Sequence, residues 1–179
     1  HRTDCRVPSL FDAKTDFETD KHMSKDFDLI VIGAGPGGYI AAIRAAQLGM
    51  RVACVDEWQN AAGGPAPGGT CTNTGCIPSK ALLQSSEHFD HAKNHFADHG
   101  ISAAGLKMDV ATMLARKNEV VKQNNDGILY LFKKNKVTFF HGRAAFAAAK
   151  DGAYALQVTG SQPEALSAKQ VQMATGSSA

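Results

Sequence analysis

The segment that decides the fold is DLIVI at residues 28–32 followed by GAGPGG at residues 33–38. The apolar run has the length of a buried parallel strand, and small and apolar residues then recur at helical spacing over 39–48. Gly49 is a predicted C-terminal cap of that helix, and residues 51–55 form a second predicted strand. Strand, glycine loop, helix and strand make a βαβ unit, the start of a doubly wound sheet.

The glycine loop has the spacing of a dinucleotide-binding site. Gly33 permits a tight turn, Gly35 lets the backbone approach a pyrophosphate, and Gly38 lets helix and strand pack closely. The pyrophosphate would lie over the helix N-terminus, where unpaired amides and the dipole favour negative charge. Asp56 follows the second strand and is placed to accept hydrogen bonds from an adenosine ribose, with Glu57 as the competing choice. A glycine-rich turn without a ligand is the simpler alternative.

The rest of the chain predicts an α/β fold, a parallel sheet plus a small antiparallel β-meander. Residues 59–70 hold four glycines and two prolines and are predicted to be irregular. Helices are expected over 78–99 and 109–134, with NNDG at 124–127 as a potential break in the second. Its candidate buried positions are Met113, Leu114, Val120, Val121, Leu129 and Phe132. The expected short strands are 137–140, 144–146, 154–159 and 170–174, with Asp151-Gly152 as a hairpin turn.

Composition excludes several classes of protein. The chain has 179 residues, 44% hydrophobic and 20% charged, with a net charge of +2. No run approaches the ~20 apolar residues of a membrane-spanning helix, and the near-even charge does not indicate a nucleic-acid partner. Residues 1–25 are interpreted as an extension, linker or cloning remnant, and 26–179 as the domain. No secretory signal is visible, so we expect a cytoplasmic protein.

Two cysteines lie close together in GGTCTNTGCIPSK, residues 68–80. In a regular helix the Cα atoms of Cys71 and Cys76 would be roughly 8–9 Å apart, whereas a disulfide needs less than ~7 Å. A bridged pair therefore requires a distorted segment, for which Gly75 supplies the freedom. A thiolate near the N-terminus of the following helix would be favoured by its dipole, and Lys80 could add positive charge. Two free buried thiols, or half of a zinc site lacking its second cysteine pair, are the alternatives.

On these residues, and on MATGS at 173–177, the chain resembles the pyridine nucleotide–disulfide oxidoreductase family over about residues 26–177. IPSKALL at 77–83 is most similar to the branch that acts on lipoamide. Glutathione reductases usually carry a second lysine where this chain has Ser79. Two features depart from the family: Thr72 and Thr74 stand where apolar residues are commoner, and the strand at 170–173 is unusually polar.

The resemblance implies a Rossmann-like FAD-binding domain of a flavoprotein that oxidises protein-bound dihydrolipoamide to lipoamide, with NAD as the final acceptor. Cys71 would be the interchange thiol, Cys76 the thiol beside the flavin, and Lys80 a neighbour of the isoalloxazine. The expected catalytic residues are therefore Cys71, Cys76 and Lys80. The expected cofactor-binding residues are Gly33, Gly35, Pro36, Gly37, Gly38, Asp56, Glu57, Gly69, Thr70, Cys71, Cys76, Lys80, Gly142, Arg143, Ala144, Thr175, Gly176 and Ser177.

The resemblance also implies partners. Family members add an NAD-binding domain and a dimerisation domain with a catalytic His–Glu pair, and this chain shows no second glycine fingerprint. We therefore expect it to be the first FAD-binding segment of a longer homodimer, inactive in turnover alone. Its partner would be the lipoyl-bearing acyltransferase of a 2-oxo acid dehydrogenase complex. The alternatives are a glutathione- or mercuric-reductase-type enzyme, or a non-catalytic nucleotide-binding module.

Four histidines follow one stripe of the helix predicted over 78–99, namely His88, His91, His95 and His99. Their spacing would suit a metal ion on a helix face. No carboxylate repeats with them, so we interpret the stripe as a solvated face and expect no metal.

Overall fold

The computed structural model describes residues 25–148, 152–160 and 163–176. Ser177 and nearly all of the predicted N-terminal extension lie outside these ranges. The strands are β1 (Lys25–Ile32), β2 (Val52–Asp56), β3 (Thr138–His141), β4 (Arg143–Phe146), β5 (Tyr154–Thr159) and β6 (Glu164–Met173). The helices are α1 (Pro36–Gln47), α2 (Gly69–Asn73), α3 (Cys76–Asn94) and α4 (Val110–Lys134), with a 3₁₀ turn η1 (Phe96–His99).

All six strands form one sheet in the order β3-β2-β1-β6-β5-β4. β3, β2, β1 and β6 are parallel, whereas β6, β5 and β4 are antiparallel. The predicted α/β class, with a parallel sheet and an antiparallel meander, is confirmed. The meander is continuous with the sheet because β6 pairs with β1 along one edge and with β5 along the other.

The parallel half of the sheet is buried on both faces. Along β2, Val52 and Cys54 face one cluster, while Ala53 and Val55 face the other. The first face is covered by α1 and by the end of α4, through residues such as Phe132, which is 1% exposed. The second face is covered by the antiparallel strands. Burial on both faces explains why β1 and β2 are nearly continuous apolar runs rather than alternating ones.

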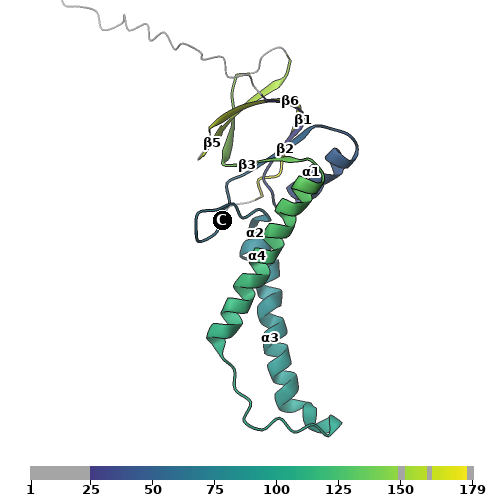
Figure 1. Cartoon of the computed structure of the whole chain (residues 1–179), viewed down its shortest axis with the longest axis vertical. Helices are drawn as coiled ribbons and strands as arrows, with labels where there is room; N and C mark the ends of the chain where they lie inside the picture. The colour runs from purple at the N-terminus through teal and green to yellow at the C-terminus, as the bar shows by residue number, and fades with distance from the viewer. Residues whose placement is uncertain (1–24, 149–151, 161–162, 177–179) are drawn as a thin grey trace, which may run out of the picture.

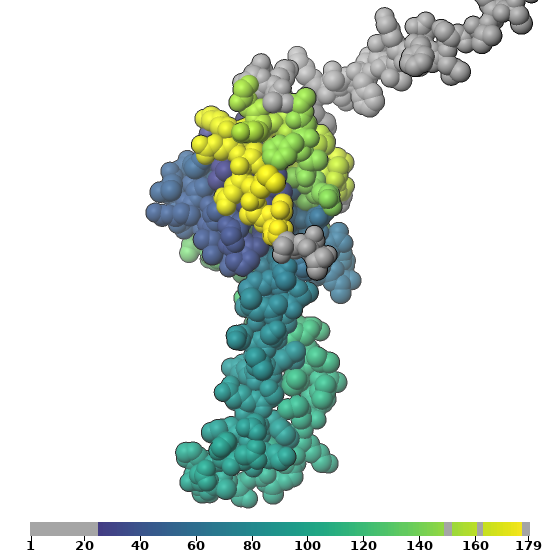
Figure 2. Space-filling view, turned by 180° about the vertical axis from the view of Figure 1, so that it is seen from behind, coloured from purple at the N-terminus to yellow at the C-terminus, as the bar shows by residue number. Residues whose placement is uncertain are grey.

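An antiparallel pair of helices, α3 and α4, projects from the sheet as a narrow arm (Figure 1). Figure 2 shows from behind how the arm projects from the rounded body of the domain. Asp109 caps α4 by accepting hydrogen bonds from the Ala111 and Thr112 amides, which fixes the start of the helix. Only the last part of α4 reaches the core, so Leu114, predicted to be buried, is 44% exposed.

Two helix predictions need correction. The potential break at residues 124–127 does not occur, and α4 is continuous over 25 residues. The helix expected to start at Pro78 starts instead at Cys76 and ends at Asn94, after which a 3₁₀ turn follows. The uninterrupted helix contains a buried side chain, Asn125, which is described with the site below.

Candidate functional site

The glycine loop leaves the carboxyl end of β1 in a conformation that only glycine fits. Gly33 has a φ of +101°, and a Cβ there would lie 2.3 Å from the Ala174 carbonyl oxygen. A Cβ on Gly38 would lie 1.8 Å from the carbonyl oxygen of Gly33. These contacts fix the turn and the close approach of α1 to β1 and to the segment after β6. Gly35 is the N-cap of α1 and Pro36 its first residue, so the loop presents its backbone, not side chains, at the helix N-terminus.

Asp56 organises this loop from the end of β2. The Ala34 amide donates to its Oδ2 atom at 2.7 Å, and the Trp58 amide donates to its Oδ1 atom at 2.9 Å. Each carboxylate oxygen can accept a further hydrogen bond, so a role toward a ribose is compatible with this geometry. Glu57 is exposed, and its carboxylate lies 3.6 Å from the Arg143 guanidinium. The geometry therefore gives Asp56 a structural task and leaves Glu57 at the surface.

A cavity of about 420 Å³ opens at the carboxyl ends of β1 and β2. This is the edge at which open α/β sheets bind their ligands. Seven of the predicted cofactor-binding residues line it: Gly33, Asp56, Glu57, Gly142, Arg143, Ala144 and Thr175. Trp58 also lines the cavity and was missed, although its position directly after the two acidic residues was an available signal.

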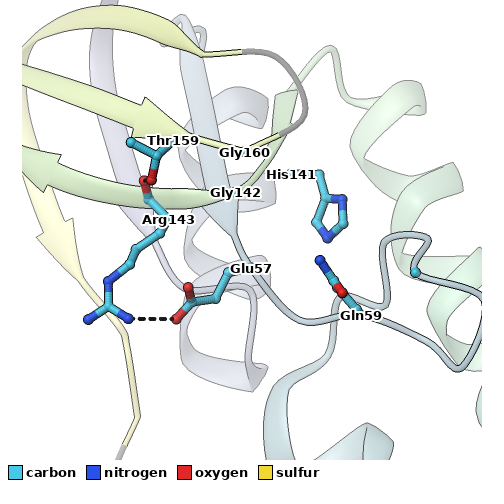
Figure 3. Close-up of a pocket in the computed structure, with 8 residues that line it drawn as sticks. Glu57, Gln59, His141, Gly142, Arg143, Thr159 and Gly160 are labelled. Atoms are coloured by element: carbon cyan, nitrogen blue, oxygen red, sulfur yellow. Dashed lines mark hydrogen bonds and ion pairs between the residues drawn. The ribbon is translucent and has the colours of Figure 1, made fainter.

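A second cavity of about 430 Å³ adjoins the first and shares Glu57, Gly142 and Arg143 with it. Figure 3 shows the Glu57–Arg143 ion pair on one side and His141 facing Gln59 on the other. Within the described residues, the buried Nε2 atom of His141 has no hydrogen-bond partner. Neither His141 nor Gln59 is among the site residues predicted from the sequence.

The cysteine segment is divided between two helices, so it is distorted although its two thiols are not bridged. Cys71 lies in α2, and Cys76 is the first residue of α3. The Gly75 amide donates to the Thr70 carbonyl at 2.7 Å, and a Cβ on Gly75 would lie 3.1 Å from that oxygen. The chain therefore folds back on itself at this glycine. Both thiols are free, and Cys76 lies at the N-terminus of a 19-residue helix, where the dipole stabilises a thiolate.

The two thiols interact with each other. The pKa of Cys71 is raised, first by the hydrogen bond between its side chain and that of Cys76, and then by partial burial. Cys71 therefore holds its proton to higher pH than an ordinary cysteine. The pKa of the Cys54 thiol is also raised, but for another reason: Cys54 is buried beneath the glycine loop, where desolvation disfavours the thiolate.

The nucleotide loop and the cysteine segment are in direct contact. The Gly68 amide donates to the Ala34 carbonyl at 2.8 Å, and a Cβ on Gly69 would lie 2.9 Å from the Cα atom of Gly35. Thr72 is buried, and its side chain packs against Gly68, where a Cβ would lie 2.4 Å away. A group lying along the glycine loop would therefore also lie beside the start of α2, the helix that carries Cys71.

Two asparagines hold the cysteine segment in place. Asn125 of α4 is 7% exposed and donates through Nδ2 to the Pro67 carbonyl at 2.7 Å and to Asn73 Oδ1 at 3.1 Å. Asn73 in turn donates to the Ala66 carbonyl at 2.9 Å and the Gly69 carbonyl at 3.0 Å. The expectation of a helix break at 124–127 overlooked this role, since asparagine in a sequence favours turns.

Lys80 lies one turn after Cys76 on α3, at the surface. It lines a groove between α3 and α4 together with Ile77 and Arg116. Within the described residues, no carboxylate lies within ion-pair distance of its ammonium group. A separate cavity of about 460 Å³ is lined by Cys71 together with Pro36, Tyr39 and Ile77. The predicted site residues thus fall into two neighbouring groups, the strand-end cavity and the cysteine segment.

Comparison with known proteins agrees with this arrangement. A family model described as pyridine nucleotide-disulphide oxidoreductase matches residues 27–179. A dihydrolipoyl dehydrogenase of Cupriavidus necator is 52% identical over 159 residues, 88% of this chain and 33% of that protein. Dihydrolipoyl dehydrogenase 1, mitochondrial, of Arabidopsis thaliana is 49% identical over 69% of this chain and 23% of its own length. A dihydrolipoyl dehydrogenase of Trypanosoma brucei brucei is 45% identical over 84% of this chain and 30% of its own length.

The chain thus spans about a third or less of the curated relatives it matches. Among the described residues, no helix is both long enough and apolar enough to cross a bilayer.

Proposed function

The chain belongs to the pyridine nucleotide-disulphide oxidoreductase family, and from this premise we propose that it holds FAD beside a Cys71–Cys76 redox pair. The full protein would oxidise protein-bound dihydrolipoamide to lipoamide and pass the electrons to NAD. The observation that carries the proposal is the placement of Cys71 in α2 and of Cys76 at the N-terminus of α3, directly after the backbone contact between Gly69 and Gly35. Two cysteines placed incidentally in a nucleotide-binding module would have no reason to share this site.

The residues present fit a dinucleotide. Gly33 and Gly38 have no room for a Cβ against the Ala174 and Gly33 carbonyl oxygens, which fixes the loop. Gly37, at the start of α1, has open space around it, and a pyrophosphate would lie there. The cavity at the strand ends supplies room for an adenosine, with Asp56 and Glu57 as candidate ribose acceptors. Gly142 would contact the adenine through its backbone, since it lines this cavity. Thr175 and Gly176 would lie toward the flavin.

The thiol chemistry follows from the two positions. A thiolate of the substrate attacks Cys71 Sγ of the oxidised pair, and Cys76 leaves as a thiolate stabilised by the N-terminus of α3. The second substrate thiol then releases Cys71, so one disulfide has been exchanged for another and the protein holds the dithiol. Bound FAD would accept the two electrons of that dithiol and deliver them to NAD. Lys80 would supply positive charge near the flavin.

The proposed partner is the lipoyl-bearing acyltransferase of a 2-oxo acid dehydrogenase complex, and the proposed assembly of the full protein is a homodimer with NAD-binding and dimerisation domains. For the compartment we propose the cytoplasm. The relative from Arabidopsis is named as mitochondrial, so imaging of the tagged full-length protein in its own cells decides this point.

The test of the proposed function is the visible absorption spectrum of the full-length protein, before and after anaerobic addition of dihydrolipoamide. We expect a flavin spectrum that gains a long-wavelength charge-transfer band on reduction, and loses that band in a Cys76→Ser variant. A protein that binds no FAD would contradict the proposal. So would a spectrum that dihydrolipoamide leaves unchanged, because the charge-transfer band requires a Cys76 thiolate beside oxidised flavin. Glutathione and mercuric ion, assayed in parallel, identify the alternative substrates.

A further inference from the structure

The C-terminal end of α3 lies at the outer end of the α3–α4 arm, far from the sheet (Figures 1 and 2). Three imidazoles lie close together there. His91 lies in the last turn of α3, His95 is its C-cap, and His99 ends η1. The ring centroids of His91 and His95 are 5.3 Å apart, and those of His91 and His99 are 6.5 Å apart. All three side chains are exposed. The helix alone would not bring His99 into this group; the 3₁₀ turn folds it back.

The spacing of the first two rings fits a shared metal ion. Imidazole nitrogens bind divalent transition metals at ~2.1 Å, and two such bonds at roughly tetrahedral or square angles place the ring centroids roughly 4.5–5.3 Å apart. The separation of His91 and His95 falls at the upper end of this range. The separation of His91 and His99 lies beyond it, so His99 would join only after a side-chain rotation.

The local electrostatics favour a cation at this position. The C-terminal end of a 19-residue helix carries partial negative charge on its last carbonyl groups. Asp98 lies in the same 3₁₀ turn, and Asp90, which accepts a hydrogen bond from Asn94, lies one residue before His91. Lys93 is the opposing charge in the last turn of α3. His91 is also held against the edge of the Phe96 ring, with centroids 5.7 Å apart, which restricts its rotation.

In place of the metal-free solvated face expected from the sequence, we propose that His91 and His95 bind a divalent transition-metal ion at the tip of the arm, with water in the remaining coordination positions. In the part of the chain that the structure describes, no three His, Cys, Asp or Glu side chains are arranged as a metal site, so the site is a two-ligand chelate. Imidazole ligands select borderline ions, and the affinity order should be Cu²⁺ above Ni²⁺ and Zn²⁺, with Mn²⁺ weakest. This site is independent of the redox cysteines.

The experiment is isothermal titration calorimetry of the full-length protein with Ni²⁺, in a form without a purification tag. The Cys71→Ser/Cys76→Ser background is used, because reduced thiols would bind the metal themselves. We expect one site, which weakens roughly 10–100-fold or more in His91→Ala and in His95→Ala, since loss even of a group supporting a ligand costs that much. His88→Ala is the matched control, an exposed histidine of the same helix outside the ring cluster, and should bind as the parent does.

Three results would overturn the proposal: no Ni²⁺ binding by the parent, unchanged binding in His91→Ala and His95→Ala, or an equal loss in His88→Ala. Circular dichroism of each variant establishes that α3 is still formed. Repeating the titration with Cu²⁺ and Mn²⁺ tests the ion class, and tighter binding of Mn²⁺ than of Cu²⁺ would refute the imidazole ligands.

Discussion

The backbones of Gly35 and Gly69 lie in contact, with a Cβ on Gly69 placed 2.9 Å from the Cα atom of Gly35. Gly35 belongs to the nucleotide loop and Gly69 begins the helix that carries Cys71. Through this contact, two motifs separated by more than thirty positions in the sequence become one site. A flavin dinucleotide lying over the loop would therefore lie beside the proposed redox pair.

Gly69→Ala should separate these two segments. Alanine at a φ of +60° is strained, and its methyl group would press on backbone rather than on a flexible side chain. We expect a loss of ~1–3 kcal/mol in stability and faster release of FAD, measured by thermal unfolding and by flavin fluorescence. Gly49→Ala is the control, because Gly49 also has a positive φ, +89°, but has open space around it. If both variants lose FAD equally, the contact has no special role.

The competition between Asp56 and Glu57 is settled by comparing Asp56→Ala with Glu57→Gln. Asp56→Ala leaves the Ala34 and Trp58 amides without their acceptor, at a cost of ~1–3 kcal/mol each where water does not replace it. Glu57→Gln removes only an exposed ion pair with Arg143, worth ~0–1 kcal/mol. We expect the FAD dissociation constant to rise at least ~10-fold in the first variant and to change little in the second. A larger effect of Glu57→Gln would make Glu57 the ribose ligand.

Much of this arrangement could be predicted from the sequence, because the glycine motif and the cysteine pair carry local backbone requirements. Gly75 was recognisable as a point where the cysteine segment could bend, although the spacing required a distortion only of a bridged pair and both thiols are free. β1 and β2 followed from their continuous apolar runs. The contacts between residues far apart in the sequence could not be predicted in this way. Asn125 lies in a stretch that locally favours a turn, and only its buried hydrogen bond to Pro67 explains it. His141 becomes a site residue through strand order, which places it beside Asp56 and which local patterns do not fix.

Asn125→Ala tests the clamp on the cysteine segment. The variant leaves the buried Pro67 carbonyl and Asn73 Oδ1 without their donor, so we expect a loss of ~1–3 kcal/mol in the free energy of unfolding, read from urea denaturation. Because the clamp holds the loop that precedes Cys71, the variant should also release FAD faster. Asn124→Ala is the matched control, since Asn124 is exposed and bonds only to the Val120 carbonyl of its own helix. Equal stability of the two variants would mean that the Asn125 hydrogen bonds do not stabilise the cysteine segment.

The raised pKa of Cys71 gives a pH dependence with a definite sign. A thiol whose pKa is raised stays protonated to higher pH, so its alkylation by iodoacetamide should accelerate at a higher pH than that of an ordinary cysteine. The largest cause is the hydrogen bond with Cys76, so Cys76→Ala should move the alkylation profile of Cys71 to lower pH. Peptide mass spectrometry of the reduced full-length protein separates the sites, and Cys54, buried with a raised pKa of its own, should remain unmodified. A Cys71 profile that does not move in Cys76→Ala would mean that the two thiols do not interact, and the shared redox site would lose its physical basis.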